Sequence, residues 1–90
     1  MVQLHYDLGS INYKLQGYAD AIEYYKEALR ILEENTGDMY WSHVISGNLG
    51  LAYLRVNQNE RGKPLLDRAK EYIKNENGSK HYDYLFLSSQ

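Results

Sequence analysis

Three histidines are the first residues in this chain whose type and spacing could hold a metal ion. His5, His43 and His81 lie at equal intervals of 38 residues. Imidazole is the commonest metal ligand, but metal-binding histidines on a helix stand four residues apart, and no two of these do. They also fall out of step with the repeat described below, so they would not stack in a column. We interpret them as solvated or partly packed, and expect no metal and no cofactor.

Serine hydroxyls are the remaining candidate nucleophiles, because the chain has no cysteine. A catalytic serine needs a base and an orienting acid beside it, and none of the six serines stands in a recognisable nucleophile turn. The glycines are too scattered for a phosphate-binding loop. Glu33 and Glu34 lie at a predicted helix end and are best interpreted as solvated. We therefore expect a protein that is not an enzyme.

Ten tyrosines could offer a platform on which nucleic-acid bases stack. Phosphate neutralisation by Lys and Arg supplies most nucleic-acid affinity, and here ten Lys and Arg stand against twelve Asp and Glu, for a formal charge of −2. We therefore expect no nucleic-acid partner. Tyr25, Tyr53 and Tyr72 are better interpreted as core residues whose hydroxyls reach the surface.

Length and composition narrow the class of protein further. No stretch approaches the roughly 20 apolar residues that span a bilayer, and residues 1–6 lack the basic start and apolar run of a signal peptide. Without cysteine, neither a disulfide nor a thiolate metal site can form. We expect one small cytoplasmic domain with a thin core and no membrane partner.

The elements that must position these residues are helices, because apolar residues recur at intervals of three and four. Four stripes follow one another: Leu4, Leu8, Ile11 and Leu15; Ala21, Ile22, Tyr25, Ala28, Leu29 and Leu32; Val44, Ile45, Leu49, Ala52, Tyr53 and Val56; Leu65, Leu66, Ala69, Tyr72 and Ile73. The sequence therefore predicts an all-α fold of four helices, each with an apolar face that a neighbouring helix must share.

Local signals suggest where these helices begin and end. Gly17 can take a left-handed conformation after the first helix, and Asp38 can cap the third. Pro64 lies near the start of the fourth, where it would cost a hydrogen bond if the helix began as early as Glu60. We therefore expect a late or slightly distorted start. The tail from Tyr82 to Ser89 is predicted to be a fifth helix, although propensity alone would also allow a strand.

Comparing the chain with itself reveals a repeat of 41 residues. The pair Leu8-Gly9 recurs as Leu49-Gly50, and Ala28 and Gly37 recur as Ala69 and Gly78. Small residues occupy equivalent places where helices would cross closely: Gly9, Ala21, Ala28, Gly50, Gly62 and Ala69. We expect two helical hairpins, over residues 2–38 and 39–78, followed by a partial third repeat or capping helix over 79–90.

These motifs resemble the tetratricopeptide repeat family, which carries a Leu-Gly pair on its first helix and Ala-x-x-x-aromatic-x-x-Ala on its second. The first pattern matches Leu8-Gly9-Ser10-Ile11-Asn12-Tyr13-Lys14-Leu15 and Gly47-Asn48-Leu49-Gly50-Leu51-Ala52-Tyr53-Leu54. The second matches Tyr18-Ala19-Asp20-Ala21-Ile22-Glu23-Tyr24-Tyr25-Lys26-Glu27-Ala28-Leu29. The resemblance implies a right-handed α-α superhelix, a solenoid of two hairpins plus a fifth helix.

The second unit departs from the family pattern. Gly62 stands where alanine is expected and Leu66 where the aromatic is expected, and no proline closes either unit. The 41-residue period exceeds the common period of about 34 residues. It looks like the long-repeat branch that includes kinesin light chains, Pins-type spindle adaptors and many bacterial regulators.

Family members act as adaptors and scaffolds that bind peptides on a concave face built mainly by the first helix of each hairpin. By resemblance, the binding residues here are Tyr6, Ser10, Tyr13, Lys14, Leu51, Leu54 and Arg55. An apolar, aromatic floor with Lys14 and Arg55 at one side suits an amphipathic helix or an extended peptide with an acidic residue. Alternatively, Leu51 and Leu54 only contact a neighbouring helix. The Lys and Asn of the family's carboxylate clamp are absent, which argues against chaperone-tail binding.

Two other roles remain open at this point. The apolar tail from Tyr82 to Leu87 could make a homo-oligomer through the open end of the array. The chain could also be a sensory segment of a larger bacterial-type regulator. It ends at Gln90, where another Leu-Gly pair would be due, which favours a fragment of a longer array.

Overall fold

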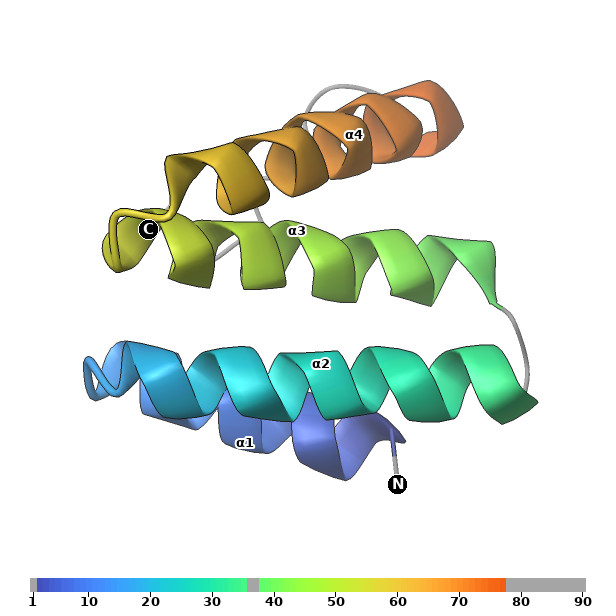
Figure 1. Cartoon of the computed structure of the whole chain (residues 1–90). Coiled ribbons are helices and arrows are strands. Elements are labelled where there is room, and N and C mark those ends of the chain that lie inside the picture. Colours follow the sequence, from blue (N-terminus) through green and yellow to red (C-terminus); the bar gives the residue numbers. More distant parts are fainter. Residues whose placement is uncertain (1, 36–37, 78–90) are drawn as a thin grey trace.

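The computed structural model describes residues 2–35 and 38–77. The secondary-structure elements in these ranges are four α-helices. They are α1 (Val2–Lys14), α2 (Tyr18–Asn35), α3 (Met39–Arg55) and α4 (Asn59–Asn77), and no strand occurs between them (Figure 1). The all-α prediction is confirmed. The predicted fifth helix over 79–90 lies outside the described residues.

The four helices form two hairpins that repeat the same local geometry. α1 ends at Lys14 and α3 ends at Arg55, 41 residues later, and the starts of α2 and α4, Tyr18 and Asn59, are also 41 residues apart. Within each tight turn one residue is left-handed, Gln16 with φ 67° and Asn57 with φ 64°. These two positions are again one period apart, so the period holds in the backbone.

The left-handed residue of the first turn differs from the prediction. Gln16, not Gly17, takes the positive φ, and the Gly17 N–H donates to the Asn12 carbonyl at 2.7 Å. A Cβ at position 17 would lie 3.3 Å from the Asn12 side-chain oxygen and 3.4 Å from the Asn12 carbonyl oxygen. The turn therefore lies close to α1, and a side chain at position 17 would need Asn12 to shift slightly.

The helix boundaries of the second hairpin confirm one prediction and correct another. Asp38 caps α3, since its carboxylate accepts the Trp41 N–H at 3.2 Å. α4 begins at Asn59, so the start is not late as expected, and Pro64 lies inside the helix. The Gln58 carbonyl accepts the N–H groups of Arg61 and Gly62 and starts the helix before the proline.

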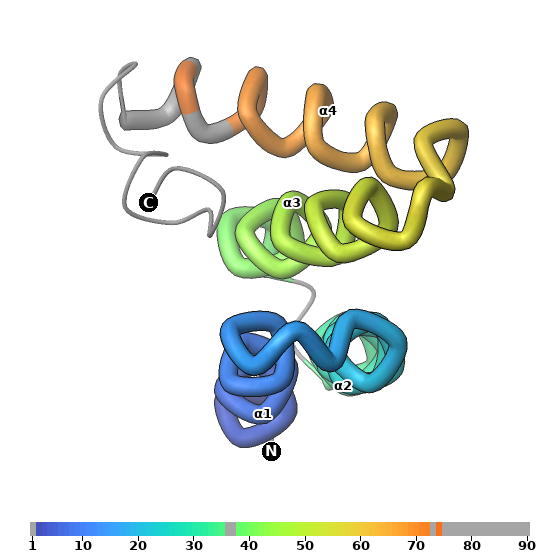
Figure 2. Tube along the Cα trace, turned by 90° about the vertical axis from the view of Figure 1, so that its left-hand side faces the viewer, coloured from blue at the N-terminus to red at the C-terminus, as the bar shows by residue number. Residues whose placement is uncertain are grey.

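Each helix packs against the next in the chain, and Figure 2 shows α1 and α2 side by side with α3 over them and α4 beyond α3 (Figures 1 and 2). The predicted stripe of α2 forms the centre of the core: Ala21, Tyr25 and Ala28 have no exposed surface. The stripe of α3 is likewise buried, with Val44, Ile45 and Ala52 fully enclosed. These two interior helices bury their apolar faces as the spacing predicts.

Small residues let the helices approach closely within each hairpin. A Cβ at Gly9 would lie 2.8 Å from the Tyr25 ring. In the second hairpin, a Cβ at Gly50 would lie 2.6 Å from the Gly62 carbonyl oxygen, and a Cβ at Gly62 would lie 2.4 Å from the Gly50 carbonyl oxygen. The departure from alanine at Gly62 thus has a cause, because α3 and α4 are in contact backbone to backbone.

The apolar stripe of α1 contradicts the expectation that a neighbouring helix shares it. Leu4, Ile11 and Leu15 are 52%, 53% and 76% exposed. α1 instead turns Gly9 and Tyr13 toward the core, with Val2 and Tyr6 packed beside them. The spacing identified an apolar face correctly, but among the described residues no helix covers it.

Within that same part of the chain, no helix is both long enough and apolar enough to cross a bilayer.

Candidate functional site

Two hydrogen bonds join the first helices of the two hairpins and define a shared surface, which we call the α1–α3 face. Asn48 on α3 donates its side-chain amide to the Tyr6 hydroxyl on α1 at 3.1 Å. Two turns further along, the Arg55 Nε–H donates to the Tyr13 hydroxyl at 2.9 Å. Each bond spans 42 residues of sequence. The two bonds hold α1 and α3 in register over most of the length of α1.

The Tyr13–Arg55 pair forms the end of this face nearest the hairpin turns. The Tyr13 ring is buried and meets the Tyr18 ring edge to face at 5.2 Å. The Arg55 guanidinium lies 6.0 Å from the centre of the Tyr13 ring, within the range of a cation–π contact. The hydrogen bond to Tyr13 raises the pKa of Arg55. Arg55 is exposed, and within residues 2–35 and 38–77 its Nε–H is the group that bonds to Tyr13. Its terminal amino groups have the geometry to receive a carboxylate.

A second polar pair supports the face from beneath. The hydroxyls of Ser10 and Tyr25 lie 2.9 Å apart, which joins α1 to the fully buried centre of α2. Burial raises the pKa of Tyr25 far above its ordinary value, and burial likewise raises the pKa of Tyr6. Both phenols therefore remain neutral at physiological pH. Ser10 acts here as a packing and hydrogen-bonding residue.

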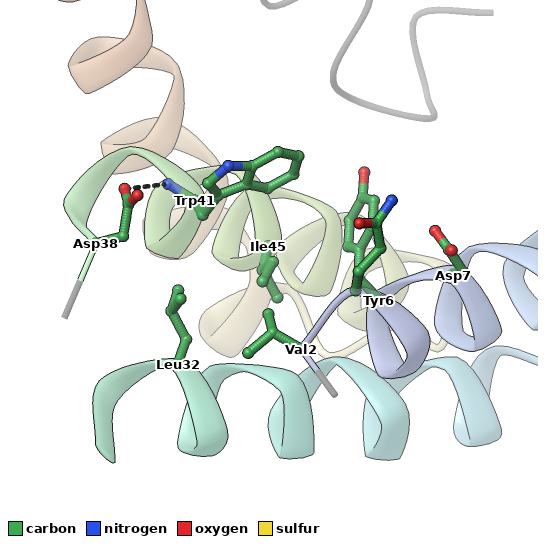
Figure 3. Close-up of a pocket in the computed structure, with 8 residues that line it drawn as sticks. Val2, Tyr6, Asp7, Leu32, Asp38, Trp41 and Ile45 are labelled. Atoms are coloured by element: carbon green, nitrogen blue, oxygen red, sulfur yellow. Dashed lines mark hydrogen bonds between the residues drawn. The ribbon is translucent and has the colours of Figure 1, made fainter. Parts of the chain in front are cut away.

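At the opposite end of the face, near the start of α1, lies a pocket of about 370 Å³ (Figure 3). Its walls come from α1, α2, α3 and the residue that caps α3: Val2, Gln3, Tyr6, Asp7, Leu32, Asp38, Trp41 and Ile45. Leu32 from α2 and Ile45 from α3 point toward Val2, and the Trp41 indole lies above them. We call this site the Trp41 pocket.

Trp41 gives this pocket the character of a binding site. Its side chain is 44% exposed, although its ring meets the Tyr6 ring edge-on at 6.1 Å and the Tyr40 ring at 6.2 Å. Amphipathic aromatic rings that are held by neighbours and left partly open are favoured anchors of protein interfaces. The pocket can therefore take an apolar side chain against its aliphatic floor.

Charge differs between the two ends of the face. Asp7 and Asp38 line the Trp41 pocket, whereas Lys14 and Arg55 lie at the far end. The distance along the helix axis from Tyr6 to Tyr13 is about 10 Å. This is slightly longer than the distance over which physiological salt screens the interaction between charges. A ligand lying along α1 would therefore meet an acidic end and a basic end.

The predicted binding residues divide into three groups in the structure. Tyr6, Ser10, Tyr13 and Arg55 lie together on the α1–α3 face, and Lys14 is exposed at its end. Leu54 is half-buried, and Leu51 is only 4% exposed. Leu51 therefore packs in the core of this structure and offers almost no free surface. The role of these residues in peptide binding stays a prediction.

Two residues of this face, Asn48 and Trp41, were not predicted from the sequence. Asn48 is fully buried and bonds to both Tyr6 and the Val44 carbonyl. Trp41 lies in the first turn of α3, three residues after the cap at Asp38. The signal that could have identified it is its type, since it is the chain's single tryptophan and stands beside a predicted cap.

Among residues 2–35 and 38–77, no group of three or more His, Cys, Asp or Glu side chains could hold a metal ion. His43 instead stacks on Tyr72, with ring centres 4.1 Å apart, and His5 lies against Tyr24. Both histidines are thus partly packed, as interpreted from the sequence.

Comparison with known proteins bears on the first hairpin. Residues 2–35 match the family model described as tetratricopeptide repeat. This range spans α1 and α2 entirely. The match is to the general repeat and does not test the long-repeat branch. No curated protein and no solved structure matches the chain.

Proposed function

We propose that this chain, which belongs to the tetratricopeptide repeat family through residues 2–35, binds a peptide or helical segment of another protein along the α1–α3 face. Repeats of this family mediate protein–protein interaction and are not enzymes in themselves. In this role the chain is an adaptor that holds a partner protein and catalyses no reaction itself.

The observation that carries the proposal is the Trp41 pocket. Apolar pockets with a few polar groups at the rim are the usual form of a recognition site, and here the floor is Val2, Leu32 and Ile45. Trp41 remains 44% exposed above this floor. A ligand side chain that covers Trp41 would remove apolar surface from water, and each Å² removed contributes about 25 cal/mol of favourable free energy.

The second anchor is the guanidinium of Arg55. Its Nε–H is held by Tyr13 at 2.9 Å, so the planar group is positioned before a ligand arrives. A positioned guanidinium loses less side-chain entropy on binding a carboxylate than a mobile one does. Lys14, exposed on the last turn of α1, adds a second positive charge at the same end.

Together these anchors specify the chemistry of the ligand. It would carry a large apolar side chain for the Trp41 pocket and an acidic residue about 10 Å further along. A basic residue would be favoured beside the apolar one, because Asp7 and Asp38 line that end. An amphipathic helix with such residues two turns apart meets these requirements, as does a short extended peptide.

Trp41 is also the probe for the test, because the chain has no other tryptophan. Synthetic peptides with an apolar and an acidic residue at the required spacing are titrated while its fluorescence is followed. We expect saturable binding that Arg55→Gln weakens about tenfold, the loss of roughly one charge-assisted hydrogen bond.

The matched control is Arg68→Gln, which removes the same charge from an exposed position on α4. If both arginine variants weaken binding equally, the effect is one of net charge and the assignment of Arg55 fails. Binding that is unchanged in Arg55→Gln, with the helical circular dichroism intact, would also refute it. Leu51→Asp is unsuitable for this test, because a charge at a position 4% exposed would unfold the protein.

A further inference from the structure

The outer side of α1 carries an apolar surface that the α1–α3 face does not use. We call it the outer stripe, and it consists of Leu4, Leu8 and Ile11 on α1 and Leu15 in the turn that follows, where the Leu15 N–H still donates to the Ile11 carbonyl. Three of these are more than half exposed: Leu4 by 52%, Ile11 by 53% and Leu15 by 76%. The stripe points away from the core-facing Gly9 and Tyr13, and α1 lies at one end of the helix stack (Figure 2).

The repeat within the chain shows what such a stripe does when it has a neighbour. Moved forward by one period of 41 residues, the outer stripe corresponds to Ile45, Leu49 and Ala52 on α3 and to Val56 at its C-cap. Three of those residues are buried and Val56 is half-buried, and α3 packs directly on α2. The same pattern is therefore a helix-packing surface in the second hairpin and an open one in the first. Contiguous exposed apolar faces of this kind mark interaction sites.

Stacking a second copy head to tail would place its α4 over the outer stripe. Within the chain, α2 is the helix equivalent to α4, and it packs on the α3 stripe. Ile22 on α2 takes part in this packing, because it lines a pocket together with Tyr53 and Val56. One period later, the position of Ile22 is occupied by the exposed Lys63, and that of Leu29 by Lys70. Burying ammonium groups against leucines is unfavourable. The α4 side of a second copy is therefore the wrong occupant.

The outer stripe does match itself. Its spacing of four, three and four residues is the two-position heptad seam of a coiled coil, repeated over two heptads. When two such helices run antiparallel, Leu4 faces Leu15 of the second copy, and Leu8 faces Ile11 of the second copy. All four layers are then apolar and of similar size. A twofold axis between residues 9 and 10 generates the whole arrangement from one helix.

The flanking charges complement each other in the same arrangement. Asp7 and Lys14 both lie along one edge of the stripe, and both are exposed. The antiparallel register brings Asp7 close to Lys14 of the second copy, and the symmetry forms this pair twice. The opposite edge carries His5 and Asn12, and the antiparallel register brings His5 near Asn12 of the second copy, so no like charges meet there. Edge charges of this kind set partner choice and orientation in helix pairs.

We propose that the outer stripe joins two copies of this chain through antiparallel packing of α1 on α1. Two heptads bury less than the roughly 1,200 Å² below which specific interfaces are weak. The dimer therefore exchanges with monomer and forms at high local concentration. It uses the side of α1 opposite Tyr6 and Tyr13, so a dimer leaves both Trp41 pockets accessible. Asp7 and Lys14, at the two ends of α1, are the residues shared with the proposed peptide site.

Sedimentation of the whole chain from about 10 µM to about 1 mM tests the dimer directly. We expect the weight-average mass to rise toward twice the monomer mass, and Ile11→Asp to remain monomeric across the same range. Ile11 is 53% exposed, so its replacement leaves the helical circular dichroism unchanged. A wild-type chain that is monomeric throughout overturns the proposal, as does an Ile11→Asp variant that still dimerises.

A charge exchange tests the antiparallel register separately. Asp7→Lys alone places two ammonium groups near each other across the interface, and it should weaken association several-fold. Combining Asp7→Lys with Lys14→Asp restores opposite charges across the twofold axis and should recover the wild-type association. If the double variant associates no better than Asp7→Lys alone, the copies are not packed as proposed. Binding of peptide to Ile11→Asp is expected to be normal, so failure of the dimer and failure of the peptide site remain distinguishable.

Discussion

The Tyr13 hydroxyl accepts a hydrogen bond from the Arg55 Nε–H at 2.9 Å, and this bond connects the last turns of α1 and α3. Tyr13 is 7% exposed, whereas Arg55 reaches solvent. One residue thus belongs to the core and the other to the surface, and the bond makes the position of the surface charge depend on the packing of the core. This coupling is why the same pair matters for stability and for the proposed binding.

Removing the hydroxyl with Tyr13→Phe should destabilise the protein by about 1 kcal/mol, because one hydrogen bond to a charged donor is lost while the ring remains. The free energy of unfolding is measured by urea titration followed by circular dichroism. Tyr24→Phe serves as the control, because the Tyr24 hydroxyl makes no hydrogen bond to another residue within residues 2–35 and 38–77. Equal stability of Tyr13→Phe and wild type would show that the bond contributes nothing net.

The contact between Gly50 and Gly62 leads to a second prediction. An alanine Cβ at position 50 would lie 2.6 Å from the Gly62 carbonyl oxygen and 3.0 Å from the Leu66 nitrogen, and backbone atoms cannot move aside as side chains can. We expect Gly50→Ala to destabilise the protein by about 1–3 kcal/mol through overpacking. In an exposed helix, Gly→Ala would instead stabilise by about 0.5–1 kcal/mol.

Thermal unfolding and urea titration of Gly50→Ala check this sign. Gly9→Ala is the informative companion, because its Cβ would meet the ring of Tyr25 at 2.8 Å rather than backbone. We expect Gly9→Ala to lose less stability than Gly50→Ala, because the Tyr25 ring can tilt away from the added Cβ. A stabilised Gly50→Ala variant would mean that α3 and α4 are further apart than described.

Sequence periodicity predicted the interior helices well, because each has neighbours on both sides. The stripes of α2 and α3 contain Tyr25, Ala28, Val44 and Ile45, and all four are fully or almost fully buried. The 41-residue period also appears in the backbone, where Gln16 and Asn57 share a left-handed conformation. A pattern that repeats at the level of side chains requires the same turn at the same place.

Periodicity failed at α1 for a physical reason. Spacing shows that a helix has an apolar side, but it does not show whether another helix is present to cover it, as the exposed Ile11 demonstrates. Family resemblance placed Leu51 on the binding face, with contact to a neighbouring helix as the alternative, and Leu51 is buried. Trp41 was missed because its role depends on Val2, Leu32 and Ile45, which three different helices bring together.

Tyr25 leads to a prediction about alkaline pH. Burial raises its pKa above the ordinary value near 10, so between that value and the folded-state pKa the folded protein retains a proton that the unfolded chain releases. Stability is therefore complete below pH 10 and falls as the pH rises, by up to about 1.4 kcal/mol per pH unit for this group. Tyr6, whose pKa is also raised, adds to the fall.

Urea titrations between pH 8 and pH 11.5 measure this slope. The variant Tyr25→Phe loses the hydrogen bond to Ser10 and is less stable at pH 8, but its stability should decline less steeply above pH 10. Identical slopes in wild type and Tyr25→Phe would indicate that Tyr25 ionises as freely in the folded protein as in the unfolded chain.

The cap at Asp38 links stability to the Trp41 pocket, because the same residue starts α3 and lines the cavity. Its carboxylate accepts the Trp41 N–H at 3.2 Å, so Asp38→Ala leaves that donor without its side-chain partner. We expect a loss of about 1 kcal/mol in stability and a change in Trp41 fluorescence as the first turn of α3 frays. Asp67→Ala, at an exposed position within α4, removes an equal charge without removing a cap and should change neither property. An Asp38→Ala variant with wild-type stability and wild-type Trp41 emission would show that the first turn of α3 is held by packing alone.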